Sequence, residues 1–214
     1  ASLEQRTAQL EAEVLNLREQ LNCYQAIVGD TLGRDAAMQQ ARFSYILAPV
    51  ISSTWHRPRN YITISKGRQD GVRPGMGVVD HNGVVGVVNA CSGHTARIVS
   101  LLNEAQPFSV KLKDTPYVGT LWWKGNDRKI AYMVEVPRHA KYHTGDTVVT
   151  SGYSTTFPAG IHVGTVMGAV RGDDDNYFTL KVRLATDFAN LTAVRVIKDV
   201  RRAEIDTLAK YDLK

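Results

Sequence analysis

Cysteine is scarce in this sequence, and long hydrophobic runs are missing from it. The two cysteines, Cys23 and Cys91, are too few for a disulfide framework and lack the spacing of a zinc site. No stretch approaches the roughly 18 consecutive apolar residues that a membrane-spanning helix needs. The chain also opens at Ala1 with no apolar signal core, and we expect a segment upstream of it in the natural protein.

Familiar catalytic motifs are missing as well. The sequence has no Gly-x-Ser-x-Gly elbow, no phosphate-binding loop ending in Gly-Lys-Ser or Gly-Lys-Thr, and no helix-opening Gly-x-Gly-x-x-Gly. His139 and His143 flank a predicted loop, which offers no helix face to align two imidazoles on a metal. We therefore expect no cofactor, no metal site and no catalytic residue.

Two rival functions stay open from the residues alone. The Ser-His-Asp set of a barrel-type serine hydrolase can be assembled from Ser151 or Ser92, His94 and Asp146. The formal charge is +5, and the excess lies in residues 34–73, which hold seven basic and two acidic residues. Because this segment mixes cations with aromatic side chains, it suits a single-strand nucleic-acid binder. Its residues fall in predicted turns, which favours solvated loops, and an anionic membrane surface or protein partner is a further alternative.

The first 28 residues carry the clearest periodicity. In one heptad frame, seven of the eight seam positions are apolar or aromatic, and these are Leu3, Leu10, Val14, Leu17, Leu21, Tyr24 and Val28. In a parallel pair of helices, the flanking positions would set Arg6 against a glutamate and Glu13 against an arginine. The pattern predicts a dimeric α-helical coiled coil; an amphipathic helix lying on its own domain is the alternative.

From Phe43 onward, short β-rich runs are separated by Gly, Pro, Asn and Asp. About a dozen such runs without intervening helices favour small barrels or sandwiches over βαβ units. The expected strands are Tyr45–Ser52, Tyr61–Ser65, Gly77–Asp80, Val84–Ala90, Ala96–Leu101, Phe108–Leu112, Val118–Trp123, Lys129–Val134, Thr147–Thr150, Val163–Val170, Phe178–Leu184 and Ala193–Lys198.

A weak internal repeat divides this β-rich part in two. Gly75–Val79 followed by Val85–Val88 parallels Gly145–Val149 followed by Val163–Val166. The sequence therefore predicts a mainly β protein with an N-terminal α-helical coiled coil and two small β-barrel domains. The expected boundaries are 1–41 for the coiled-coil helix and connector, 42–113 for the first barrel unit, 114–198 for the second and 199–214 for a C-terminal tail. The last strand either stays in the second unit or returns to the first.

Adjacent tryptophans point to a covered surface. Neighbouring residues of a strand face opposite sides, so one of Trp122 and Trp123 fills a barrel interior while the other emerges outside. The outward side chain needs a cover, which is the other barrel, the N-terminal helix or a partner protein. Phe157, in the longer insertion of the second unit, either joins such a surface or plugs a barrel end. We name Trp122, Trp123 and Phe157 as a candidate partner surface.

Two motifs together carry a family resemblance. Lys66–Val79 with Gly83–Val88 forms the first, and Gly145–Gly152 with Phe157–Val166 forms the second. Both are similar to the extracytoplasmic part of the rod shape-determining MreC family, and with the preceding coil the resemblance covers nearly the whole chain. Members of that family carry a short cytoplasmic start, one membrane-spanning helix, a coiled coil and two small β-barrels. This chain departs from the pattern because the spanning helix is absent from it.

The resemblance implies a scaffold that catalyses nothing. Family members link MreB filaments and the membrane protein MreD to the transpeptidase and glycosyltransferase that build peptidoglycan, and they can self-associate. We therefore expect a scaffold of the cell-elongation machinery, periplasmic or at the extracytoplasmic face of the inner membrane and attached through a spanning helix outside this sequence. Its expected partners are a second copy of the chain, a cell-wall transpeptidase, MreB and MreD. We expect no nucleic acid to bind.

Overall fold

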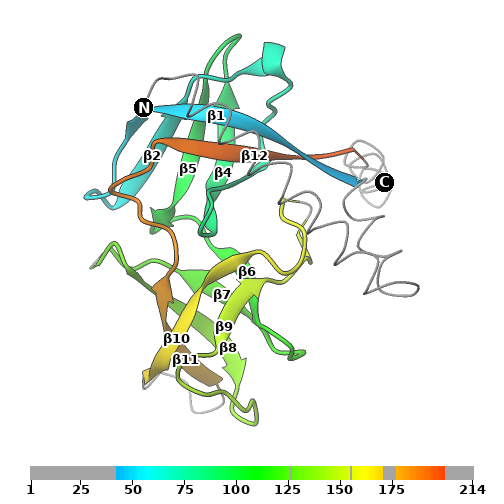
Figure 1. Cartoon of the computed structure of the whole chain (residues 1–214). Coiled ribbons are helices and arrows are strands. Elements are labelled where there is room, and N and C mark those ends of the chain that lie inside the picture. Colours follow the sequence, from blue (N-terminus) through cyan, green and yellow to red (C-terminus); the bar gives the residue numbers. More distant parts are fainter. Residues whose placement is uncertain (1–41, 126, 155, 171–176, 201–214) are drawn as a thin grey trace, which may run out of the picture. The chain divides into compact units, whose positions relative to one another are not determined.

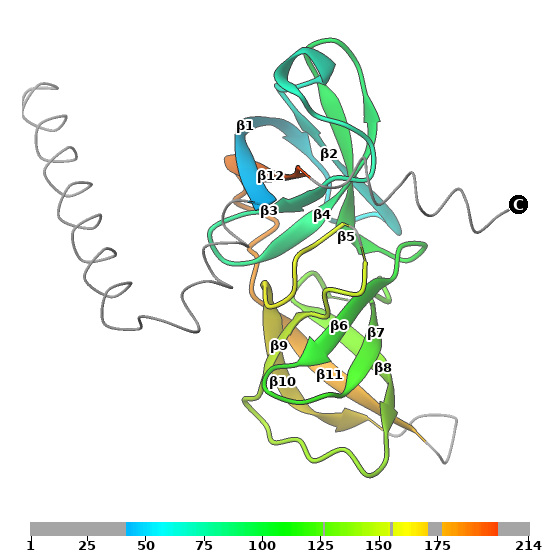
Figure 2. The same ribbon diagram turned by 90° about the vertical axis from the view of Figure 1, so that its right-hand side faces the viewer.

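The computed structural model describes residues 42–125, 127–154, 156–170 and 177–200. The predicted coiled-coil seam from Leu3 to Val28 and the predicted tail beyond Val200 lie outside these described residues. Within them, twelve strands form two closed barrels of six strands each (Figures 1 and 2). The prediction of a mainly β protein with two small barrels is therefore confirmed.

The first barrel is assembled from both ends of the β-rich region. Its strands follow the closed order β1-β12-β3-β4-β5-β2, and a short 3-10 helix, η1 (Arg68–Asp70), lies between β2 and β3. The bounds are β1 (Phe43–Ser53), β2 (Arg59–Ile64), β3 (Gly77–Val79), β4 (Val84–Cys91), β5 (Ala96–Asn103) and β12 (Ala193–Asp199). Closure gives every strand of the sheet a hydrogen-bonded neighbour on both sides, so that the sheet has no edge strand.

The second barrel is continuous in sequence. Its closed order is β10-β11-β8-β7-β6-β9. The bounds are β6 (Phe108–Leu112), β7 (Val118–Trp122), β8 (Ile130–Pro137), β9 (Thr147–Thr150), β10 (His162–Val170) and β11 (Tyr177–Leu184). Each of the twelve predicted strands overlaps one of the strands in these two barrels.

The division between the barrels differs from the expected boundary after residue 113. β6 pairs with β7 and β9, so Phe108–Leu112 belongs to the second barrel and not to the first, where the sequence analysis placed it. β12 pairs with β3, which is the arrangement in which the last strand returns to the first barrel. β12 joins the first barrel through a distant segment, and β6 joins the second barrel through its neighbour β7 and the distant β9. Alternation within a strand does not encode which strands it pairs with.

Alternating apolar residues fill each barrel. In β2, Ile62 and Ile64 are fully buried, whereas their neighbours Tyr61 and Thr63 are half-buried on the other face. In the second barrel, the side chains of Leu121 and Met133 are likewise no more than 1% exposed. This is the period-two pattern of a strand with one face toward a core, and burying each such side chain stabilises the fold by about 1.5–3 kcal/mol.

The internal repeat corresponds to the same local structure in both barrels. Gly75 and Gly145 both have a positive φ, at 81° and 98°, a conformation that glycine adopts at little cost. The Gly75 amide donates to the carbonyl of Val88 at 2.6 Å, and the Gly145 amide donates to that of Val166 at 2.8 Å. Because Val88 and Val166 are also equivalent in the repeat, the two copies close the same turn onto the same strand.

Candidate interaction surfaces of the two barrels

Trp122 and Trp123 divide between inside and outside, as the alternation predicts. Trp123 is only 4% exposed, and its Nε1 donates a hydrogen bond to the carbonyl of Asp127 at 2.7 Å. Trp122, the last residue of β7, is half-buried and lines a groove of about 440 Å³ with Glu104 and Val134. Trp123 is therefore a core residue, and Trp122 is the member of the pair that a partner can reach.

Phe157 lies in the junction between the two barrels. It is 6% exposed, and its ring lies 6.2 Å from that of Phe108. On its other side it meets Gly77 of β3, where an added Cβ would lie 2.6 Å from Cε1 of the ring. The repeat places Thr147 at the position equivalent to Gly77, so the barrel itself accepts a branched residue there. Glycine at position 77 serves the approach of Phe157, and Phe157 is not an exposed partner anchor.

A second contact joins the same segments. His162, the first residue of β10, places its Nδ1 3.2 Å from the carbonyl oxygen of Asn82 in the β3–β4 turn. Within that turn, the amides of Asn82 and Gly83 donate to Oδ1 of the buried Asp80 at 2.9 and 2.7 Å. Asp80 thus shapes the turn that the second barrel contacts, in the manner of an Asx turn.

Two cations of the basic segment, Lys66 and Arg73, make local hydrogen bonds. Lys66 Nζ donates to Oδ1 of Asp70 at 2.8 Å, and Arg73 donates to the carbonyl of Arg68 at 3.2 Å. The Lys66 hydrogen bond, joined by one from the Gly67 amide, holds the pKa of Asp70 below its usual value. These pairings hold Lys66 and Arg73 against neighbouring turns of the first barrel.

The residues named for rival chemistry make other contacts. The Ser151 hydroxyl lies 2.7 Å from the Ser109 hydroxyl, and the His143 ring lies 3.9 Å from Asp146. The described residues form no Ser-His-Asp hydrogen-bond chain, and His139 stacks edge-on against Tyr117 at 5.6 Å. In the ranges that the structure describes, no group of three His, Cys, Asp or Glu side chains is arranged to hold a metal ion.

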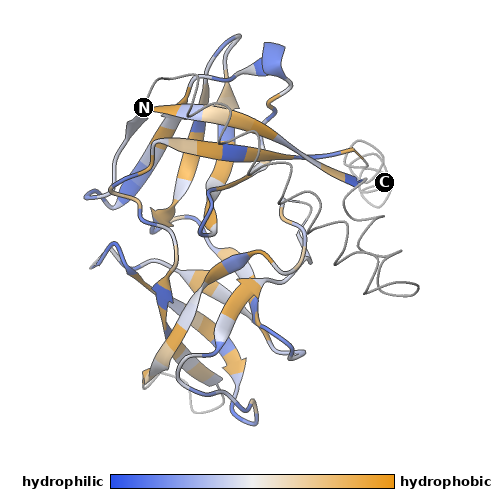
Figure 3. Ribbon diagram, in the orientation of Figure 1, coloured by the Kyte–Doolittle hydropathy of each residue, from blue (hydrophilic) through white to orange (hydrophobic). Residues whose placement is uncertain are grey.

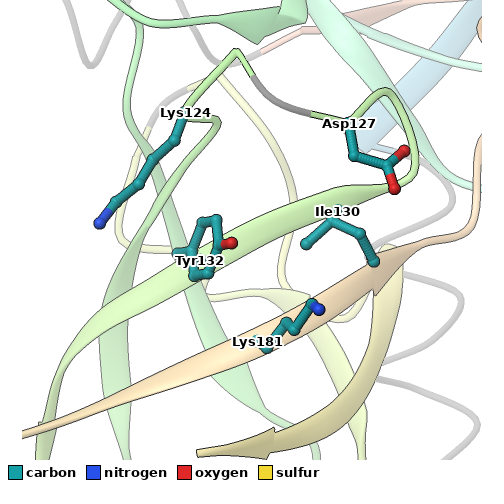
Figure 4. Close-up of a pocket in the computed structure, with 5 residues that line it drawn as sticks. All are labelled: Lys124, Asp127, Ile130, Tyr132 and Lys181. Atoms are coloured by element: carbon teal, nitrogen blue, oxygen red, sulfur yellow. The ribbon is translucent and has the colours of Figure 1, made fainter. Parts of the chain in front are cut away.

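A polar pocket of about 200 Å³ lies on the second barrel (Figure 4). Lys124, Asp127, Ile130, Tyr132 and Lys181 line it. The Lys124 ammonium lies 4.9 Å from the centre of the Tyr132 ring, which engages it in a cation–π contact. Figure 4 shows the two lysine side chains pointing away from each other, so they do not converge on one bound anion.

The most exposed apolar feature of the first barrel is the outer face of β1. Tyr45, Leu47 and Ile51, which we call the β1 stripe, are 53%, 65% and 57% exposed. They alternate with Ile46, Ala48 and Val50, which are buried or half-buried, and most of β1 is coloured hydrophobic in Figure 3. Large apolar side chains in a row on a solvent face indicate an interaction surface.

The residues of the β1 stripe were not among the predicted site residues, although the sequence contains a signal for them. A barrel strand with one solvated face should alternate apolar and polar residues. The segment Tyr45–Ile51 is instead apolar at every position, which indicates that both faces are covered.

The described part of the chain thus defines a tandem β-barrel protein whose conspicuous features are internal packing contacts and exposed apolar side chains. The chain belongs to the MreC family, because residues 50–198 match the family model described as rod shape-determining protein MreC, barrel core. That match spans the strands of both barrels from the end of β1 to β12.

Individual relatives agree with this assignment. The cell shape-determining protein MreC of Listeria monocytogenes is 29% identical over 212 residues, covering 97% of this chain and 66% of that protein. The solved structure of MreC from Listeria monocytogenes is 26% identical, covers 92% of each chain and superposes with a TM-score of 0.68. A solved complex between the penicillin-binding protein PBP2 and MreC from Helicobacter pylori contains a chain with a TM-score of 0.59 and 17% identity, which covers 74% of this chain and 99% of that one. This last likeness concerns the fold.

The chain spans between 38% and 66% of the length of the curated relatives that it matches. Among the residues that the structure describes, no helix has the length and hydropathy needed to span a membrane.

Proposed function

We propose that this chain is a non-enzymatic scaffold of the cell-elongation machinery that acts outside the cytoplasmic membrane. The observation that carries the proposal is the family match over both barrels, together with relatives named as cell shape-determining proteins. Attachment through a spanning helix outside these 214 residues, and links to MreB and MreD, are parts of the same proposal.

A cell-wall transpeptidase is the proposed partner of the barrels. The support is the complex of PBP2 with MreC in Helicobacter pylori, whose MreC chain shares the barrel fold. Binding of a protein partner needs a few desolvated apolar or aromatic anchors. Trp122 and the β1 stripe offer such side chains, whereas Trp123 and Phe157 are committed to internal packing.

The test is isothermal titration calorimetry. The 214-residue chain is titrated with the extracytoplasmic domain of the penicillin-binding transpeptidase from the same organism. We expect saturable one-to-one binding, and an unrelated extracytoplasmic protein serves as the control. A dissociation constant weaker than about 1 mM, equivalent to about 4 kcal/mol of binding free energy, would contradict the proposal. Trp122→Ala should weaken the complex by more than about 1 kcal/mol if this side chain is an anchor.

Self-association is proposed through the N-terminal segment. The seven apolar seam residues support a parallel coiled coil, in which Leu10 meets its own copy and Leu21 does the same. These positions are about 16 Å apart along a helix, so an antiparallel pair cannot bring both into self-contact. With Cys23 and Cys91 replaced by serine, Leu10→Cys and Leu21→Cys should each give disulfide-linked dimers. Crosslinking at only one position would exclude the parallel register.

A further inference from the structure

We propose that the β1 stripe is a docking surface for a protein segment that combines apolar side chains with carboxylates at both of its ends. The stripe runs from Tyr45 to Ile51, which is about 20 Å along an extended strand. Its three side chains are all more than half exposed, so that no part of the described chain covers them. Burying them against another apolar segment would remove their surface from water, which is favourable at about 25 cal/mol per Å².

Charge identifies the occupant. The exposed charged side chains on the strands around the stripe are all cations, and these are Arg59, Arg97, Arg195 and Lys198. Asp199, the one carboxylate on β1, β2, β5 and β12, is half-buried at the end of β12. A partner with carboxylates beside its apolar residues therefore complements this face.

The cations bracket the stripe. At one end, the Arg195 guanidinium lies 6.0 Å from the centre of the Tyr45 ring, and a hydrogen bond to the Asp80 carbonyl at 2.7 Å holds it in place. At the other end, Ser52 pairs with Thr63, and Thr63 pairs with Arg97. Arg97 is therefore two strands from the stripe, which is about 10 Å.

Both guanidinium groups are oriented before a partner arrives. Arg97 lies 5.0 Å from the Tyr61 ring and donates to Oδ1 of Asn89 at 3.1 Å. A guanidinium has five N–H donors, so these contacts leave others for a carboxylate. Cations that are already positioned lose little side-chain freedom on binding.

A second copy of the chain does not fit this surface as well. In a two-fold pair, each stripe would face the other stripe, and the cations beside one stripe would be brought toward the cations beside the other. Like charges placed opposite one another in an interface oppose association. The same argument favours an acidic partner over a basic one.

The test places the photo-crosslinking amino acid p-benzoylphenylalanine at position 47 of the full-length protein in cells, with position 153 as a matched exposed control. Tyr153 is 83% exposed on the second barrel. We expect a crosslink from position 47 to another protein, mapped by mass spectrometry to a segment with apolar residues and carboxylates. Arg97→Glu and Arg195→Glu should each reduce its yield at least fivefold, while Arg183→Glu, a charge reversal at an exposed position of β11 in the second barrel, leaves it unchanged.

A charge exchange completes the test. Replacing the mapped carboxylate by lysine should restore the crosslink to the Arg97→Glu or Arg195→Glu variant. Crosslinks confined to residues 1–41 or 201–214 of the same chain, to a second copy, or to lipid would overturn the inference, as would insensitivity to both charge reversals. Thermal unfolding of each variant verifies that the barrel is intact.

This inference deepens the proposed function and rests on it only for the first partner to be tried. If the transpeptidase binds the chain and Leu47→Glu leaves the affinity unchanged, the stripe is not its docking surface and the scaffold function stands. If position 47 captures a different acidic segment and the transpeptidase does not bind, the stripe inference stands and the transpeptidase proposal fails.

Discussion

The ring of Phe157 in the second barrel packs against the backbone of Gly77 in the first, leaving no room for a side chain there. A Cβ at position 77 would lie 2.6 Å from the ring and 2.5 Å from the carbonyl oxygen of Thr156. The loop from Thr156 to Phe157 therefore joins the barrels by direct contact between a glycine and an aromatic ring.

Gly77→Ala should destabilise the protein by about 1–3 kcal/mol, because the ring or the strand must move to admit the methyl group. Urea unfolding measures the change. Gly93→Ala is the control, since a Cβ there meets only the Gln69 amide, at 3.8 Å. We expect the control to remain within about 1 kcal/mol of the parent. Equal effects of the two substitutions would mean that Phe157 does not constrain position 77.

Asp80→Ala should lower the free energy of unfolding by about 1–3 kcal/mol. The substitution leaves the amides of Asn82 and Gly83 without their acceptor in a buried turn. Asp80→Asn keeps one side-chain oxygen in the same place and should cost less than Asp80→Ala. Chemical denaturation of the parent, Asp80→Asn and Asp80→Ala measures the free energy of unfolding of each. An Asn variant as unstable as the Ala variant would show that the acceptor oxygen does not stabilise the turn.

Lys66→Gln should raise the pKa of Asp70 toward its ordinary value of 3.8, since the Lys66 hydrogen bond is the largest cause of the lowered pKa. A carboxyl group with a lowered folded-state pKa contributes stability above its unfolded pKa, and that contribution is lost as the pH falls through the folded pKa. Carboxyl-detected NMR titration measures the shift. The pKa of Asp187, lowered mainly by Asn190, should not change, and an equal shift there would point to a general effect.

Trp123→Phe should cost about 1 kcal/mol from the lost Nε1 hydrogen bond to Asp127, in addition to any loss of packing. Trp122→Phe should cost less, because that side chain is half-buried and its indole makes no hydrogen bond among those that the described residues form. Thermal unfolding of both variants compares them. A greater loss for Trp122→Phe would reverse the assignment of inner and outer tryptophan.

Strand positions could be predicted from sequence because alternation and turn residues act within a few neighbouring positions. Ile62 and Ile64 alternate with Tyr61 and Thr63, and Asn82–Gly83 marks a tight turn. The membership of β6 could not be predicted in this way. Its Val110 pairs with Gly119 in the neighbouring β7 and with Thr150 about forty residues away, and alternation within β6 indicates neither partner.

Site residues were harder to predict because exposure depends on what packs from a distance. Phe157 is an aromatic residue in a loop, which suggests an exposed anchor. Gly77, eighty residues earlier, leaves the space into which its ring packs and becomes buried. The prediction that one of Trp122 and Trp123 faces the barrel interior and the other faces outward is correct, because adjacent residues of a strand face opposite sides. The coiled-coil residues from Leu3 to Val28 stay a prediction.

The return of β12 to the first barrel sets an order of folding. The second barrel, from Phe108 to Leu184, is continuous and can close once Leu184 has been synthesised. The five earlier strands of the first barrel must wait for Ala193–Asp199, and until then β1 and β3 present open edges. Open edges recruit other strands and promote aggregation. A chain that stops before residue 193 therefore contains one closed barrel and one open sheet with unpaired edges. Addition of β12 closes the first barrel, whose other strands were synthesised first, and so protects it from aggregation.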